Sequence, residues 1–185
     1  MKQPNITTVA CLLASSILLS GCATNIAKPT ASPRPTTERL GSFESVLYEE
    51  VTLAPRFASA PPNQRAARKI NEELITGLQN VFPGMRIVEG AKSPTADKSL
   101  AIRPEIKEIK FIGGAARFWV GPMAGSSAVL MQVKFVDLAS GNVLAAPEFY
   151  RAASAWGGGM SMGASDNMML TAIVQDIITY AVSNR

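Results

Sequence analysis

Two stretches carry their apolar residues on one side of a helix, and they constrain the fold more than any other feature. The first, RAARKINEELITGLQNVF, starts at Arg65, and the second, DNMMLTAIVQDIITYAVSNR, ends the chain. Their apolar stripes are Ala67, Ile70, Leu74, Leu78 and Val81 in the first, and Leu170, Ile173, Val174, Ile177, Ile178 and Ala181 in the second. A helix that is apolar on one side must bury that side, so each needs a second layer to cover.

Strand patterns lie before and between these helices. They are expected over 45–55, over the short MRIVEG stretch at 85–90, over 99–112, and over a hairpin that turns at ASGN (139–142) and ends near residue 152. The order β-α-β-β-β-β-α predicts an α+β fold. We expect a mainly antiparallel sheet of about five strands with two helices packed on one face.

The strand over 99–112 contains an irregularity. Leu100, Ile102 and Ile106 set one alternation of apolar residues, and Ile109 and Phe111 set the opposite one. A simple strand would turn its apolar side outward after such a switch, which predicts a β-bulge near Lys107 and Glu108. Pro104 has no N–H to donate and predicts an edge or an irregular pairing at its position.

The N-terminus, MKQPNITTVACLLASSILLSGC, has a charged start, a short apolar run and small residues at its end, as in a secretory signal peptide over 1–21. Its last four residues, Leu19, Ser20, Gly21 and Cys22, resemble the lipobox of bacterial lipoproteins. The resemblance implies cleavage before Cys22 and acylation of its thiol, with Cys11 removed. The alternative is a signal peptide or anchor that contains a cysteine by chance.

A lipid on Cys22 implies membrane attachment without a membrane-spanning helix. Ala23 follows the cysteine where inner-membrane lipoproteins often have aspartate, so the resemblance implies the outer membrane, with the domain facing the periplasm. Residues 22–44 are rich in Pro, Ser and Thr and predict an extended tether of up to ~60 Å. The folded domain is then expected over 45–185.

Histidine is absent, which removes the commonest general base and the commonest metal ligand. The remaining possibility is a serine nucleophile activated by a lysine, drawn from Ser126, Ser127 or Ser161 and Lys110 or Lys134. Nothing in the sequence brings such a pair together. GPMAGSS (121–127) lacks the lysine of a phosphate-binding loop and runs into a strand. No catalytic residues, cofactor or metal are predicted, and the dispersed positive charge gives no reason to expect nucleic acid.

Two Gly-rich segments, within 113–127 and 156–165, combine glycine with large adaptable side chains, and we name six candidate interaction residues there. These residues are Arg117, Trp119, Met123, Trp156, Met160 and Met162. The alternative is that both tryptophans lie in the core and the glycines make turns. Arg117 is either a surface charge or a buried one paired with a carboxylate such as Asp137.

The stretch from Gly113 to Leu144, GGAARFWVGPMAGSSAVLMQVKFVDLASGNVL, resembles a bacterial lipoprotein family known only as a domain of unknown function. The shared features are the Arg-aromatic pair, the Gly-x-x-x-Gly turn and the Asp-x-x-Ser-Gly turn, and the resemblance extends from about Val46 to the C-terminus. It provides no catalytic residues. We therefore predict an outer-membrane-anchored, non-enzymatic domain that binds an envelope protein; the alternatives are a subunit of a homo-oligomeric envelope assembly or secretion complex, and an enzyme of unrecognised type.

Overall fold

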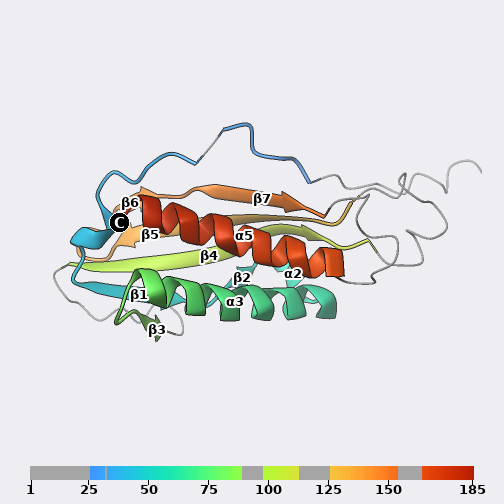
Figure 1. Ribbon diagram of the computed structural model, residues 1–185, viewed down its shortest axis with the longest axis horizontal. Helices are drawn as coiled ribbons and strands as arrows, with labels where there is room; N and C mark the ends of the chain where they lie inside the picture. Colours follow the sequence, from blue (N-terminus) through green and yellow to red (C-terminus); the bar gives the residue numbers. More distant parts are fainter. Residues whose placement is uncertain (1–25, 32, 89–97, 113–125, 154–163) are drawn as a thin grey trace, which may run out of the picture.

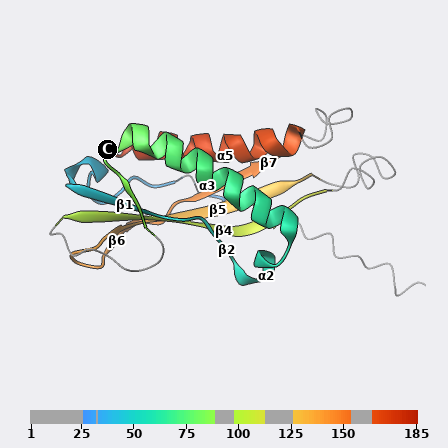
Figure 2. The same ribbon diagram turned by 90° about the horizontal axis from the view of Figure 1, so that it is seen from below.

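A computed structural model describes residues 26–31, 33–88, 98–112, 126–153 and 164–185. The two long helices, α3 (Pro61–Val81) and α5 (Ala164–Ser183), lie side by side on one face of a single sheet, so the fold is α+β as predicted (Figures 1 and 2). A 3-10 turn, η1 (Leu40–Ser42), and the short helix α2 (Pro55–Ala58) complete the described helices. None of the helices within the described ranges has the length and hydropathy of a membrane-spanning segment.

Over the described residues the sheet has seven strands rather than about five, because two predicted strands are each broken in two. The first gives β1 (Ser45–Glu49) and β2 (Thr52–Leu53), and the return strand of the hairpin gives β6 (Val143–Ala145) and β7 (Glu148–Ala152). The remaining strands are β3 (Arg86–Val88), β4 (Ser99–Lys110) and β5 (Ala128–Asp137). The longest ladder, β4–β5, is antiparallel, as are β5–β6 and β5–β7, whereas β1 pairs in parallel with both β3 and β4.

The predicted bulge in β4 is confirmed. The register with β5 shifts between Ile106 and Glu108, which keeps Ile106 and Ile109 on the same buried side of the sheet. Pro104 lies where β4 passes from its pairing with β1 to its pairing with β2, which confirms the predicted irregular pairing there. On its other side Pro104 faces Val133, whose N–H donates to the carbonyl of Pro147 at 3.1 Å, so the β4–β5 ladder does not require an N–H from Pro104.

The helices bury the predicted stripes against the sheet. The buried residues of α3 include all five stripe residues, and it begins four residues before the first predicted residue because Pro61 and Pro62 occupy helix positions that need no N–H donor. In α5 the stripe is buried except Ile178, which is partly buried and meets α3. A Cβ added to Gly77 of α3 would lie 2.1 Å from the Cδ1 of Ile178, so glycine permits the close contact of the two helices.

Parts of residues 22–44, which the composition predicts to be an extended tether, pack on the domain. Leu40 has no exposed surface and belongs to the main core, and Ile26 is also buried, against the sheet face opposite the helices. We call residues 26–31 and 33–40 the strap. It runs along the sheet beyond β7 and joins η1 at the far end (Figure 1). The division into signal peptide, tether and domain otherwise stays a prediction.

Candidate functional site

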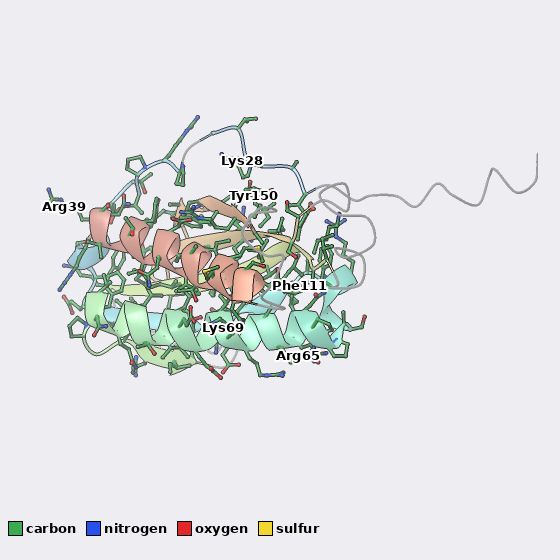
Figure 3. The ribbon with its side chains drawn as sticks, turned by 45° about the vertical axis from the view of Figure 1, so that its right-hand side comes forward. Lys28, Arg39, Arg65, Lys69, Phe111 and Tyr150 are labelled. Atoms are coloured by element: carbon green, nitrogen blue, oxygen red, sulfur yellow. The ribbon has the colours of Figure 1, made fainter. Side chains whose placement is uncertain are left out.

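A groove of about 750 Å³ lies between the strap and the adjacent edge of the domain. One wall is the strap, and the other is formed by β7 and the C-terminal half of α5. Lys28 of the strap and Tyr150 of β7, both labelled in Figure 3, belong to opposite walls. The lining residues are Lys28, Pro29, Thr30, Ala31, Pro33, Pro35, Glu148, Phe149, Tyr150, Arg151, Asp176, Thr179, Tyr180, Ser183 and Asn184.

The β7 wall presents free backbone groups. The N–H of Ala153 donates to the carbonyl of Ser127 at 2.8 Å, which fixes the alternation of hydrogen bonds between β7 and β5. By that alternation the N–H and C=O groups of Glu148, Tyr150 and Ala152 point away from β5. In the described part of the chain no backbone hydrogen bond joins them to the strap. Among the described residues the groove therefore contains a sheet edge without a backbone partner, the kind of edge to which an extended peptide can add as a further strand.

The strap is fastened at both sides of this groove. Towards η1, the hydroxyl of Tyr180 donates to the carbonyl of Arg34 at 2.7 Å, and the N–H of Thr36 donates to the side-chain oxygen of Asn184 at 2.9 Å. The N–H of Thr37 donates to the carbonyl of Leu144 in β6 at 3.2 Å. Burial raises the pKa of Tyr180, whose ring packs against Phe135 and Phe149, so its hydroxyl remains a donor at neutral pH.

At the other side, Ile26 packs on Ala128, Leu130 and Tyr150 in a small apolar cluster separate from the main core. Between these fastenings the strap spans the groove, and Lys28 and Thr30 are exposed there. Lys28 has no ion-pair partner among the described residues. The groove is thus bridged by a segment that is held at its ends and leaves space beneath.

An ion pair crosses the groove wall from β7 to α5. Arg151 meets the carboxylate of Asp176 through two hydrogen bonds, Nε to Oδ2 at 2.6 Å and Nη2 to Oδ1 at 2.5 Å. The hydrogen bonds from Arg151 to Asp176 raise the pKa of the guanidinium, which stays charged. Such a two-point pair fixes the geometry of the wall more than its stability, because both side chains remain partly exposed to solvent.

The residues predicted from sequence as interaction or lipidation sites lie outside the described residues. They are Leu19, Ser20, Gly21, Cys22, Arg117, Trp119, Met123, Trp156, Met160 and Met162. The flanks of the two Gly-rich segments are described, and Ser127 joins them. Its Oγ accepts from the N–H of Ile112 at 3.0 Å and its carbonyl accepts from Ala153, so both segments leave the sheet at the same end.

The polar clusters of the described residues hold the fold together. Tyr48 donates to the side-chain oxygen of Asn71 at 2.9 Å, the N–H of Val51 donates to the same oxygen, and burial is the main cause that raises the pKa of Tyr48. Asp137 accepts from Ser140 and from the N–H of Ala139 within its own turn, which lowers its pKa. Within the described ranges no three potential ligands gather as a metal site, and neither Lys110 nor Lys134 forms a hydrogen bond to a serine.

Three solved structures illustrate what the chain is similar to in shape. A PelC dodecamer from Paraburkholderia phytofirmans is 15% identical, with a TM-score of 0.49 over 81% of this chain and 94% of that chain. Protein XCC0632 from Xanthomonas campestris is 9% identical, with a TM-score of 0.48 over 83% and 95%. Lipoprotein GNA1162 from Neisseria meningitidis is 12% identical, with a TM-score of 0.33 over 72% and 95%. No curated protein matches the chain.

A family model gives the more specific result. It matches residues 50–159, which include most of the sheet, helix α3 and the stretch of the predicted Arg-aromatic and Asp-x-x-Ser-Gly motifs. More than half of the chain is matched, and the chain therefore belongs to DUF4410, a domain of unknown function.

Proposed function

We propose that the protein is a lipid-anchored domain that faces the periplasm from the outer membrane and acts by binding another envelope protein, not by catalysis. The observation that carries the proposal is the strap. The segment that follows the lipobox-like Leu19–Cys22 is fastened to the domain at Ile26, at Arg34 and at Leu40, and it forms one wall of the groove. The proposed anchor and the strap are therefore consecutive parts of one N-terminal segment, and that segment forms one wall of the groove.

The groove favours an extended partner. An incoming segment can pair its backbone with the outward groups of Glu148, Tyr150 and Ala152, which gives affinity without a particular sequence. Its side chains would alternate between the two sides of the strand, towards Arg151 and Asp176 on the helix side and towards Tyr150 on the other. The strap itself is poorly suited to pair with the β7 edge, because Pro29, Pro33 and Pro35 have no N–H to donate.

The anchor is tested by replacing Cys22. We expect Cys22→Ala to abolish incorporation of labelled palmitate and to remove the protein from the outer-membrane fraction, whereas Cys11→Ala, the matched control, should do neither. Mature-sized Cys22→Ala protein that still fractionates with the outer membrane contradicts the anchor.

The binding edge is tested with Glu148, whose N–H points into the groove. Glu148→Pro removes that donor at the first residue of an edge strand, where proline is tolerated, and Glu148→Ala is the matched control that keeps it. A cysteine introduced at the exposed Thr30 reports occupancy of the groove by crosslinking in intact cells. The crosslinked species should be lost in Glu148→Pro and retained in Glu148→Ala, with both variants folded.

Three outcomes contradict this binding mode: no crosslinked species at all, one that persists in Glu148→Pro, or one with the mass of two copies of this chain. The last would favour the homo-oligomeric alternative. It would also predict that the apparent size of the soluble domain rises with protein concentration.

A further inference from the structure

We propose that the end of the domain at which Ile26 is buried rests against the phospholipid headgroups, so that the anchor holds the domain in one orientation at the membrane surface. The inference rests on the proposed acylation of Cys22. It replaces the picture of a domain carried on a long flexible tether.

The distance from the lipid to the first fastening is short. Only Ala23, Thr24 and Asn25 separate Cys22 from Ile26. Even a fully extended chain covers at most ~3.6 Å per residue, so the Cα atoms of Cys22 and Ile26 lie within roughly 14 Å of each other. An acyl chain on Cys22 places that residue at the headgroup level, and Ile26, only 6% exposed, brings the sheet with it.

The position of Ile26 on the sheet identifies the end that faces the lipid. Ile26 contacts Ala128, the first residue of β5, and Ala128 is paired with Lys110 on one side and with Ala152 on the other. The chain therefore reaches the membrane where β4 and β7 end and β5 begins. Helices α3 and α5 both start at this same end (Figures 1 and 2).

The described side chains at this end suit a headgroup surface. Arg65 in the first part of α3 is exposed, and Lys110 ends β4; neither has a carboxylate partner among the described residues. Met168, in the first turns of α5, is 63% exposed. Basic groups interact favourably with lipid phosphates, and an exposed apolar side chain can enter the interface. The turn after β5 lies about 30 Å away along the ten residues of that strand.

The burial of Ile26 decides whether the domain has one fixed orientation at the membrane or is carried on a long tether. If Ile26 leaves its cluster, the next fastening is Arg34, twelve residues after Cys22, and the chain between them reaches up to ~43 Å. The domain could then take many orientations. The cluster of Ile26 is separate from the main core, so a change at this residue can free the tether without unfolding the domain.

The test measures the depth of two labels on the acylated protein in phosphatidylethanolamine–phosphatidylglycerol vesicles that carry nitroxide-labelled headgroups. Mature protein has no other free thiol if Cys22 is acylated and Cys11 is removed, so one introduced cysteine carries the fluorophore. Asn167→Cys labels the start of α5, and Ala139→Cys labels the opposite end; both residues are exposed. Quenching should be several-fold stronger at residue 167 than at residue 139.

Ile26→Asp should make the two labels quench to a similar extent, whereas Thr30→Asp, an exposed strap residue, should preserve the difference. Equal quenching in the unsubstituted strap overturns the fixed orientation while leaving the anchor intact. If Ile26→Asp keeps the difference in quenching between residues 167 and 139, Ile26 does not fix the orientation. Protein that does not float with the vesicles overturns the anchor and, with it, this inference. Thermal unfolding of each variant shows that the domain is folded.

Discussion

Replacing Leu40 by alanine tests whether the strap belongs to the domain. Leu40 has no exposed surface, packs in the main core and donates its N–H to the carbonyl of Asn184 at 2.8 Å. Replacing a fully buried leucine by alanine lowers the free energy of unfolding by about 2–5 kcal/mol. Because the strap can partly relax around this site, we expect a value near the middle of that range. We expect a loss of about 3 kcal/mol, which corresponds to a fall of roughly 6–12 °C in Tm for a chain of this size.

The assay is urea unfolding of the full mature chain, followed by tryptophan fluorescence and circular dichroism. Thr30→Ala is the matched control, because Thr30 lies in the same segment with its side chain exposed, and surface substitutions change stability by about 0.5 kcal/mol or less. If Leu40→Ala lowers the free energy of unfolding no more than the control does, the segment is a free tether and the reasoning from burial is refuted.

Three further changes probe other contacts. Tyr180→Phe removes the donor to the strap carbonyl, so it should cost about 0.5–1.5 kcal/mol in urea unfolding and increase hydrogen exchange in the strap; unchanged exchange would argue against the bond. The hydrogen bond from Ser140 holds the pKa of Asp137 below its usual 3.8, so the ionised carboxylate stabilises the fold at neutral pH. This contribution is lost as the pH falls through the lowered pKa. Asp137→Asn should therefore remove that part of the pH dependence of the urea midpoint. Gly77→Ala should destabilise the helix pair by about 1–3 kcal/mol, and Ile178→Val, which removes the clashing methyl, should reduce that cost in a double-mutant cycle.

Periodicity predicted the parts of the fold that bury a continuous apolar face. The stripe from Ala67 to Val81 fixed the buried side of α3, and the switch of alternation between Ile106 and Ile109 located the bulge. Both signals are local, because a helix or strand that buries one face repeats its apolar residues at a fixed spacing. The split at residues 50–51 has no comparable signal, whereas the split at 146–147 contains Pro147, which cannot donate to a ladder. The expected number of strands was therefore too low.

The strap could not be predicted in the same way, because its binding does not depend on a repeated pattern. Composition over 22–44 is polar and Pro-rich, yet a single leucine, a single isoleucine and backbone hydrogen bonds to Leu144 and Asn184 are enough to fasten it. Those contacts involve residues more than 100 positions away, which a local window does not see.

Local sequence patterns do not predict the groove, for a related reason. Arg151 and Asp176 are 25 residues apart and belong to different elements, and Tyr180 reads as part of an amphipathic helix. In the sequence Ser127 is only a candidate nucleophile, whereas in the structure its buried hydroxyl accepts a hydrogen bond from the N–H of Ile112. The candidate interaction residues in those segments stay a prediction from the sequence.

Amide hydrogen exchange in the strap tests most directly whether the segment behind the lipid anchor is part of the domain. In the acylated protein on vesicles, the amides of Thr37 and Leu40, which donate to Leu144 and Asn184, should be protected to a degree comparable with β5. Exchange of both amides at the rate of an unstructured peptide, with β5 still protected, would contradict the docked strap and the oriented anchor built on it.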